Sequence, residues 1–524
     1  MTWVVRLIVV VPALAALAGL LVRRSQVAVR GVAVGSAALV TVLALAQWIA
    51  PVRRADIGGL GRLPLADLNV PLHLLSDRLS GLVSFVVALV VLAIQVFTVW
   101  YLRDDRRYVQ FAATVSLFAA GMLLVVQSAD LVLTLVGWEI MGWCSWLLIG
   151  HDSERAAARR AAYKAFLVTR VADIGMVVGL IALAVRARST DLLAVLTASG
   201  ADTMLMIGLV GVVIGVAGKS GLFPFHDWLP DAMEGPTPAS ALIHAATMVA
   251  AGTYVIARLF ALYAGQANHD GARTLLAVLA AVTMVYAALL AFAQSDIKRL
   301  LAYSTLSQIA IMIGALAAAP LETGPGPGIS HLVGHAFFKA LLFLGVGWLA
   351  ALVGVTTVAA LRGQLRSRGA LRWSMAIGLG ALAGVPPLIG FFTKDTVIDA
   401  ALQGVDEGGG FRAWVVVVAL FVTVALTAAY CMRAWLLLDT PAASTAPNES
   451  FGVAGQGLEP AAEGGGPGHG HHAPVTLPAA LAVAALAVLS IVGTLFLTSL
   501  RGALHVGLLS ALLSLLLVAG AAAA

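Results

Sequence analysis

Several charged side chains lie inside long apolar runs of the sequence. Glu139 falls in the middle of LVLTLVGWEIMGWCSWLLIG and has no basic residue within one helical turn. Arg170 and Asp173 are three residues apart in KAFLVTRVADIGMVVG, and Lys219 ends the apolar run of GVVIGVAGKSGLFPF. A charge near the centre of a bilayer costs at least about 2.5–3.5 kcal/mol, so each of these groups must be paired, hydrated or buried in protein. Glu139 therefore needs a partner from another helix or from water.

Arg170, Asp173 and Lys219 each suit proton transfer, but each also has a structural interpretation. Residues three apart lie on the same side of a helix, so Arg170 and Asp173 could simply neutralise each other. Lys219 lies shortly before Pro224, where a helix break would free carbonyls and admit water, a setting in which a lysine can change its protonation state. The alternative for Lys219 is that its side chain snorkels to the membrane interface.

A further set of titratable groups combines histidines with a lysine. His331, His335 and Lys339 are spaced by four in GISHLVGHAFFKALLFLGVGW, which places them on one side of a helix. A polar stripe has no use toward lipid, whereas imidazoles that titrate near neutrality suit proton relay. His244, in ASALIHAATMVAAGTY, lies among small residues that let helices approach closely. The alternative for these histidines is structural hydrogen bonding in the core.

A second proline motif precedes the last charged pair. Lys394 and Asp395 follow it in GVPPLIGFFTKDTVID, where they could mark the exit of a proton path or form an interfacial ion pair. Acidic and basic groups in this order suit charge-coupled proton transfer better than an ion pore, which would need rings of like charge or carbonyls. The groups that we expect to follow one another in the plane of the membrane are Glu139, Lys219, His244, His335, Lys339 and Lys394.

The composition indicates what must position these groups. Of 524 residues, 60% are hydrophobic and 11% charged, against roughly a quarter charged in a soluble domain. With about 20 residues per crossing, the sequence predicts an all-α polytopic membrane protein with about fifteen transmembrane helices. The predicted helices are 3–22, 31–50, 79–101, 111–127, 131–150, 163–185, 203–225, 239–262, 274–293, 300–318, 330–353, 372–392, 413–437, 476–496 and 502–522.

The predicted helices group into two sets of five, an odd number that requires the sets to be inverted in the membrane. The fourth helix of each set contains a proline break, at 221–224 and at 384–387. Inverted repeats with broken helices in matching positions indicate an ion-translocating site near the midplane. We also expect an interfacial helix at 354–369. The predicted regions are N-terminal helices in 1–110, a first antiporter-like repeat in 111–262, a second in 263–439, a flexible Gly/Pro/His loop in 440–474 and C-terminal helices in 475–524.

Several function classes are excluded. Both cysteines, Cys144 and Cys431, lie in apolar runs, so the chain offers neither a cysteine-ligated iron–sulfur cluster nor a disulfide framework. It has no phosphate-binding glycine loop between a strand and a helix. The net charge of +6 comes from basic residues in short loops, which orient a membrane protein and do not predict nucleic-acid binding. We expect no cofactor in this chain, and we expect the loop histidines to be solvated and not to bind metal. These histidines are His469, His471 and His472.

The loop charges also predict the orientation. The excess of basic residues lies in alternate loops, at 23–24, 103–107, 155–160, 298–299 and 362–372. By the positive-inside rule these loops face the cytoplasm, with the N-terminus outside, the C-terminus inside and the chain in the inner (plasma) membrane. The first window lacks a charged start and a convincing cleavage site, so we interpret it as a retained helix and not as a signal peptide.

Longer strings over roughly residues 75–440 closely resemble the L subunit family of bacterial proton-translocating NADH-quinone oxidoreductase, respiratory complex I. They include LVGWEIMGWCSWLLIG, AGKSGLFPFHDWLPDAMEGPTPASALIHAATMVAAGTYVIAR, QSDIKRLLAYSTLSQI, HLVGHAFFKALLFLG and GFFTKD. The resemblance implies a proton channel driven by NADH oxidation in other subunits, with the other membrane subunits as partners and no NADH site in this chain.

The resemblance also implies roles for the groups named above. Glu139 and Lys219, with Asp173 and Arg170 nearby, would control a first half-channel, because a change in field at Glu139 alters the proton affinity of Lys219. The central axis would consist of His244, His331, His335 and Lys339. The exit region would hold Lys394 and Asp395. In FPFHDWLPDA, His226 and Asp227 replace a segment that is commonly neutral, and we assign them no role.

Three alternatives remain open. One is the large subunit of a multi-subunit sodium/proton antiporter, and another is the membrane subunit of an energy-coupled inorganic-carbon transporter; both share nearly all the titratable residues. The L subunit family continues into a long lateral helix and a final span, whereas this sequence stops at Ala524, which would suit the second of these. A scaffold without transport would leave the intramembrane charges unexplained.

Overall fold

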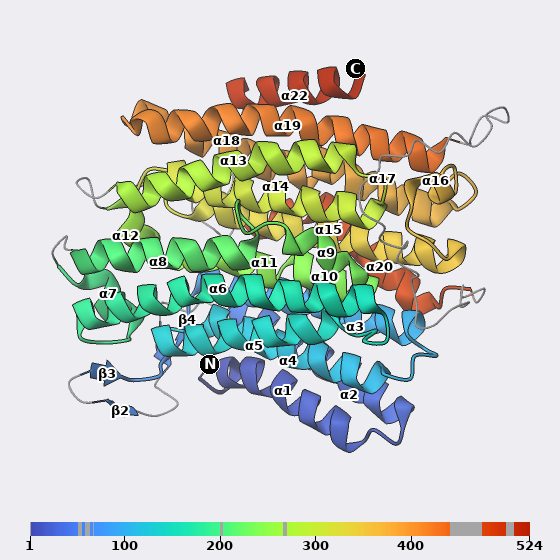
Figure 1. Cartoon of the computed structure of the whole chain (residues 1–524), viewed down its shortest axis with the longest axis horizontal. Coiled ribbons are helices and arrows are strands. Elements are labelled where there is room, and N and C mark those ends of the chain that lie inside the picture. The colour runs from blue at the N-terminus through green and yellow to red at the C-terminus, as the bar shows by residue number, and fades with distance from the viewer. Residues whose placement is uncertain are drawn as a thin grey trace.

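A computed structural model shows a bundle of long helices with nearly parallel axes, and the first and last helices lie at opposite edges (Figure 1). Two free cysteines, Cys144 and Cys431, are buried in it. Residues 441–473, which include the three loop histidines, lie outside the described part of the chain. The structure describes residues 2–50, 55–57, 63–65, 68–199, 203–265, 270–440, 474–498 and 508–523.

The N-terminal region contains three long helices and four short strands. Strands β1 and β4 pair antiparallel, as do β2 and β3. The expectation of helices alone was incomplete here, because three-residue strands are too short to carry an alternating pattern. The elements are α1 (Thr2–Leu21), α2 (Gln26–Ile49), β1 (Ala55–Ile57), β2 (Leu63–Leu65), β3 (Leu68–Val70), β4 (Leu74–Ser76) and α3 (Arg78–Tyr101).

The next part of the chain holds the first group of candidate site residues. Its elements are α4 (Tyr108–Gln127), α5 (Leu131–Ile149), α6 (Ala156–Ala187), α7 (Leu192–Thr197), α8 (Thr203–Ser220), α9 (Trp228–Asp231), the 3-10 helix η1 (Ala232–Glu234), α10 (Thr237–Ala245), α11 (Met248–Arg258) and α12 (Phe260–Ala264).

The rest of the chain holds the second group. Its elements are α13 (Gly271–Ala293), α14 (Ile297–Ala318), α15 (Gly326–Val353), α16 (Val358–Leu361), α17 (Gly369–Ala383), α18 (Ile389–Asp406), α19 (Gly410–Asp439), α20 (Leu477–Val492), α21 (Thr494–Leu497) and α22 (Leu508–Ala523).

Twelve stretches of the described chain are long and apolar enough to cross a membrane, with α10 and α11 together making one of them. The predicted helix at 372–392 is divided between α17 and α18, while α20 and α22 have 16 residues each. The fold is therefore that of a polytopic helical membrane protein. The total of fifteen crossings and the inversion of the two repeats stay predictions.

Both predicted helix breaks are present. Helix α8 ends at Ser220, and a gap of five residues separates α17 from α18. Gly221 and Gly384 have φ of +67° and +90°, a left-handed conformation that glycine adopts without a steric penalty. A cis X–Pro bond follows in each break, at Pro224 and Pro387.

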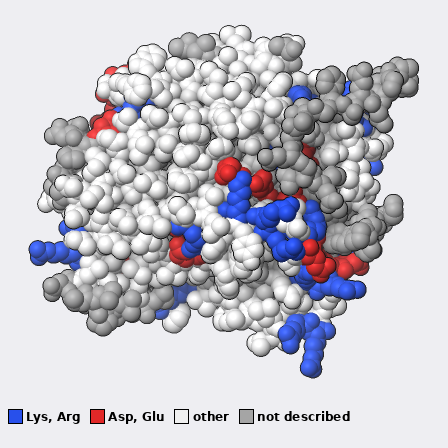
Figure 2. Space-filling view, in the orientation of Figure 1, with Lys and Arg blue, Asp and Glu red and all other residues white. Residues whose placement is uncertain are grey.

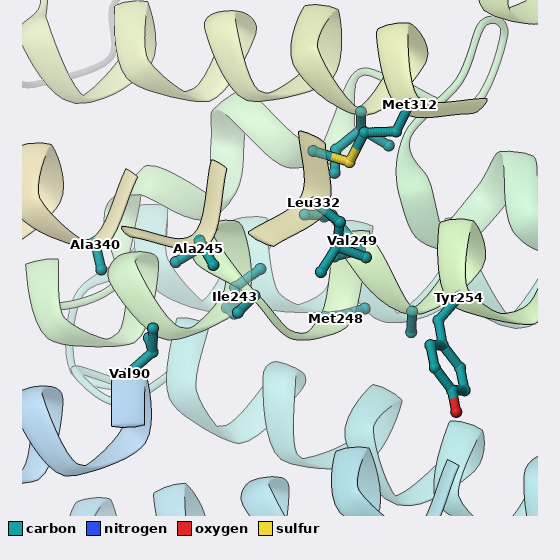
Figure 3. Close-up of a cluster of buried hydrophobic side chains, with 14 of the residues drawn as sticks. Val90, Ile243, Ala245, Met248, Val249, Tyr254, Met312, Leu332 and Ala340 are labelled. Carbon is teal, nitrogen blue, oxygen red and sulfur yellow. The ribbon is translucent and has the colours of Figure 1, made fainter. Parts of the chain in front are cut away.

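A further break separates α10 from α11 and was not predicted. Thr247, between the two helices, has φ −123° and ψ −106°, and its hydroxyl donates to the Leu242 carbonyl. No proline or glycine marks this position, so the sequence carried no signal for it. Figure 3 shows apolar side chains packed around the break, among them Ala245, Met248 and Val249, with Leu332 of α15 nearby.

Contacts between the loops that connect the helices show which loops lie at the same end of the bundle. At the end that we call the strand end, Asn69 pairs with Ser189 and Asp130 pairs with Asp191. At the other end, which we call the basic end, loops are joined by ion pairs and by one isolated bridge. These contacts are Asp105–His151, Arg155–Glu234, Arg299–Glu234, Arg372–Asp439 and the bridge Asp296–Thr357. The predicted grouping of the basic loops at 103–107, 155–160 and 362–372 agrees with these contacts.

Two expectations at the basic end were wrong. The segment 354–369 contains only the four-residue helix α16 followed by turns, and not an interfacial helix of that length. Lys298 is not an exposed loop residue, because it lies in the first turn of α14 and is 2% exposed. It donates to the carbonyls of Met233 and Gly235 at 2.7 and 2.9 Å, and these backbone acceptors stabilise its buried charge.

Glycines allow α6 and α8 to approach closely. A Cβ on Gly179 would lie 2.7 Å from the Gly208 carbonyl oxygen, and one on Gly211 would lie 2.6 Å from that of Gly175. Distances this short show that the two backbones are in contact, as in small-residue packing between membrane helices. This contact fixes Asp173 of α6 opposite Lys219 of α8.

Candidate functional site

Four charged residues form one connected network between α5, α6 and α8. Arg170 makes an ion pair with Glu139, which answers the need for a partner from another helix. The Arg170 guanidinium also lies 3.8 Å from Asp173, and Asp173 lies 3.6 Å from the Lys219 ammonium. The network alternates in charge as Glu, Arg, Asp and Lys. Arg170 and Asp173 do contact each other, but each also pairs with a residue outside their helix.

Trp138 holds the inner half of this network in place. Its indole Nε1 donates to Asp173 at 2.6 Å, and its backbone carbonyl accepts from Lys219 at 2.7 Å. The Lys219 ammonium also lies 4.6 Å from the centre of the indole ring, a cation–π distance. The sequence analysis did not single out Trp138, although it directly precedes Glu139.

Gly142 leaves room for the two cations. A Cβ at this position would meet the Arg170 guanidinium and would lie 3.1 Å from the Lys219 Nζ. Any larger residue would therefore displace one or both of these groups. No charge or periodicity in the sequence marks Gly142 among the other glycines.

Exposure differs along the network. The Glu139 and Arg170 side chains are 34% and 26% exposed, whereas Asp173 is 4% and Lys219 0% exposed. Full burial of Lys219 contradicts snorkelling. Figure 2 shows a small red and blue patch over α5 and α6, separated by uncharged surface from the larger charged cluster to its right. The network therefore begins at the outer face of the bundle and ends in its interior.

A second group lies where α10 meets α15. His244 is fully buried, and neither ring nitrogen has a hydrogen-bond partner. His335 is also fully buried; its Nδ1 is 2.9 Å from the Ala245 carbonyl, while its Nε2 has no partner. Buried polar atoms are nearly always hydrogen-bonded to protein or water. The three ring nitrogens without a protein partner therefore mark a polar position inside an apolar core.

The predicted stripe on α15 is confirmed as buried, and its members reach different helices. His331 contacts Thr393 of α18 at 2.9 Å and Gln308 of α14 at 3.2 Å. Lys339 donates to the Leu301 carbonyl at 3.0 Å and to the Ser304 hydroxyl. The stripe thus faces protein throughout. Its partners Gln308, Thr393 and Ser304 are uncharged and were not found from the sequence.

Lys394 and Asp395 lie in the second turn of α18, just after the second break. They are 3% and 0% exposed, which rules out an exposed interfacial pair. Lys394 donates to the Leu382 carbonyl near the end of α17. A Cβ on Gly384 would lie 3.9 Å from the Lys394 Nζ, so the left-handed glycine brings the backbone of the break close to this lysine.

The described residues fall into separate polar groups, with no direct contact between Lys219 and a histidine. Ser220, next to Lys219, donates to the Val249 carbonyl of α11 at 2.8 Å. This bond ties the end of α8 to the segment just beyond the α10–α11 break. Any transfer between the groups must therefore cross this region through water or side-chain movement.

The segment after the first break carries its own polar contacts. His226 is 3.2 Å from the Tyr286 hydroxyl, and Asp227 pairs with Lys164 at 2.9 Å. Asp231 also pairs with Lys164, at 2.8 Å. These contacts hold the segment between α8 and α10 against α6 and α13.

Comparison with known proteins connects this geometry to a family. The family described as NADH:quinone oxidoreductase/Mrp antiporter, transmembrane region, matches residues 128–427, more than half of the chain and all of the candidate groups. The chain belongs to this family. A second family, described as the N-terminus of chain 5 of NADH-ubiquinone oxidoreductase (complex I), matches residues 63–112.

Relatives with assigned names include chain 5 of the NAD(P)H-quinone oxidoreductase of Picosynechococcus sp., which is 37% identical over 390 residues and 71% of this chain. Subunit L of the NADH-quinone oxidoreductase of Neisseria meningitidis serogroup A is 36% identical over 394 residues and 72% of this chain. In both cases the match spans 56% of the relative, so the chain spans about half the length of these proteins.

Two solved structures share the fold. The Mrp complex of Dietzia sp. has a TM-score of 0.81 and 25% identity, covering 98% of this chain and 55% of the other. An archaeal respiratory complex, the membrane-bound sulfane sulfur reductase, has a TM-score of 0.78 and 22% identity, covering 95% and 96%. The second likeness is one of fold alone. With the family match, the likeness to the Mrp complex shows that the chain has an antiporter-like fold.

Proposed function

We propose that this chain carries protons across the membrane as the antiporter-like subunit of an NADH:quinone oxidoreductase, while NADH oxidation by quinone takes place in other subunits. The observation that carries the proposal is the network of four alternating charges between α5, α6 and α8. Such groups are costly inside a membrane, and they mark ion pathways far more often than structural supports. The chain itself contributes the proton path and no redox chemistry.

The first step depends on Asp173, which lies between two cations. Its carboxylate lies 3.8 Å from Arg170 and 3.6 Å from Lys219, so it attracts both cations. When the ion pair between Glu139 and Arg170 breaks, the Arg170 guanidinium is free to pair more closely with Asp173, in competition with Lys219. The attraction between Asp173 and the Lys219 ammonium then weakens, which favours release of the proton from Lys219. In this mechanism Arg170 transmits the change at Glu139.

The proton then passes to the histidine groups. Neutral imidazole accepts a proton on one nitrogen and gives one from the other, so His244 and His335 can each act as relay stations. Their orphaned nitrogens would be bridged by water, which is the usual partner of buried polar atoms that lack one in the protein. From there, His331 and Lys339 lead toward α14 and α18.

Lys394, with Asp395 beside it, ends the proposed path. Lys394 follows the second helix break whereas Lys219 precedes the first, but both lie near a break, which supplies backbone carbonyls and access for water. We place the basic end of the bundle in the cytoplasm by the positive-inside rule, with the chain in the inner (plasma) membrane, the N-terminus outside and the C-terminus inside.

The proposal is tested with Lys219→Ala and Glu139→Gln in membranes that contain the assembled complex. We expect NADH oxidation to continue while the proton gradient formed per NADH falls, because only the proton path is cut. Arg106→Ala removes an exposed loop cation and serves as the control, with wild-type behaviour expected. Pumping that is unchanged in both test variants refutes the proposed role.

A second candidate, the large subunit of a multi-subunit cation/proton antiporter, is favoured by the likeness to the Mrp complex over 98% of this chain. The two functions differ in what drives transport. Vesicles that acidify on addition of NADH support the first. Proton movement that appears only with an imposed sodium gradient, and not with NADH, supports the second.

A further inference from the structure

A deep groove on the outside of the bundle lies apart from the charged network. It has a volume of 670 Å³ and opens between α1 on one side and α5 and α6 on the other. Helix α4 forms its floor, since α4 packs against both α1 and α5. These helices lie in the lower half of Figure 1. The proposed proton path uses none of the residues that line it.

The lining combines polar and charged side chains at one end with aromatic and apolar side chains. At the basic end the groove is bordered by Arg107, Gln110, His151, Ser153 and Arg159. The rest of the lining is aromatic, with Trp143, Trp146 and Tyr163, or apolar, including Leu17, Leu20, Leu117 and Leu147. Aromatic rings and basic side chains near apolar surface are typical of the headgroup level of a bilayer.

The groove also has the depth of a leaflet. Arg107 and Leu117 lie ten positions apart at the start and middle of α4, which corresponds to about 15 Å at 1.5 Å per residue. Half of a hydrocarbon core about 30 Å thick is the same length. An acyl chain whose headgroup lies beside Arg107 and Arg159 would therefore reach the bottom of the groove.

Arg159 supplies a cation that no carboxylate neutralises. Its Nη1 donates to the backbone carbonyls of Ser153 and Glu154 at 2.6 and 2.9 Å, which hold the guanidinium at the mouth. Within the described chain, no acidic side chain pairs with it. Arg107 differs, because it pairs with Glu154 at 2.5 Å. The fixed charge of Arg159 thus lacks a counter-charge next to a groove that is apolar inside.

The geometry points to an anionic phospholipid as the occupant, with its phosphate on Arg159 and an acyl chain between α1 and α5. An acyl chain is thin enough to fill the groove along its length, and basic pockets between membrane helices are suited to anionic headgroups.

The test uses the full-length chain in bilayer discs that contain equal amounts of phosphatidylglycerol and phosphatidylcholine, followed by native mass spectrometry. Wild-type protein should keep phosphatidylglycerol in preference to phosphatidylcholine. Arg159→Gln should lower that preference about tenfold, since a charge-assisted contact is lost. Arg159→Lys should retain it. Thr114→Trp, which fills the groove from α4, should lower retention of both lipids.

Arg160→Gln is the matched control, because Arg160 is an exposed neighbour on the same helix that does not line the groove. Equal retention of both lipids by the wild type, or an unchanged preference in Arg159→Gln, overturns the proposal. The proposal is also overturned if Leu147→Cys, in the assembled complex, cross-links to a neighbouring subunit and not to a photoactivatable phosphatidylglycerol.

Discussion

Removal of the Asp173 charge offers the sharpest test of the network. Asp173→Asn keeps the side-chain shape, and its remaining oxygen still accepts from the Trp138 indole, now at 2.6 Å. The lost attraction to Lys219 follows from the 3.6 Å separation, because two unit charges at that distance interact by about 4–5 kcal/mol at an effective dielectric constant of about 20. Such a loss is roughly a thousandfold in an equilibrium constant, and it would weaken the hold of Lys219 on its proton.

We therefore expect Asp173→Asn to abolish most NADH-driven acidification of inverted membrane vesicles, measured with a pH-sensitive dye and divided by the rate of NADH oxidation. Breaking a buried pair also destabilises a protein by about 3–5 kcal/mol, so the amount of protein in the membrane must be measured in parallel. Asp173→Glu should restore part of the pumping, and Asp104→Asn, at an exposed loop position, should leave it intact. Wild-type pumping by Asp173→Asn at normal protein levels would show that the network is structural only.

Two further predictions concern Gly142 and the basic end. Gly142→Ala should reduce pumping about 10–100-fold by displacing the cations that meet its Cβ, whereas Gly35→Ala, where a Cβ meets nothing within 4 Å, should pump normally; equal rates would contradict this. Burial acts to raise the pKa of Asp105, but its hydrogen bonds and charge interactions with His151 and Arg107 together outweigh burial and lower the pKa from its ordinary value of 3.8. Asp105 therefore stabilises the fold above that pH and loses this effect below it, so the thermal unfolding midpoint of Asp105→Asn should fall less steeply on acidification than that of the wild type.

The long helices and the positions of two breaks were predictable because their signals are local. Apolar runs of 18 or more residues mark spans, and glycine with proline marks the ends of α8 and α17. The break between α10 and α11 was not predictable, since Ala246 and Thr247 have no such signal. The four short strands and the brevity of α16 were also missed, because elements of three or four residues show no periodicity.

The charged residues of the site were predictable from the sequence, but the residues that they contact were not. Charge inside an apolar run singles out Glu139 and Lys219 from the sequence alone, and the absence of a nearby base around Glu139 implied a partner on another helix or in water. Spacing made a pair of Arg170 with Asp173 one of two interpretations, and only the packing of α5 on α6 shows that Arg170 also pairs with Glu139. Trp138 carries no charge, so nothing in the sequence distinguished it from the other tryptophans of α5.

The gradient of exposure along the network gives the proposed mechanism a direction. A charge that approaches from outside the bundle can act on Glu139 and Arg170, which are 34% and 26% exposed, but Asp173 and Lys219 are shielded by protein. Inside the protein the effective dielectric constant is low, so each charge of the network acts strongly on the next one. A distant charge acts on them only weakly, because salt at the surface screens its field. In the proposed mechanism, an external event therefore reaches Lys219 through movement of Arg170, and the orientation of that one guanidinium would determine whether Asp173 holds the proton on Lys219 or lets it go.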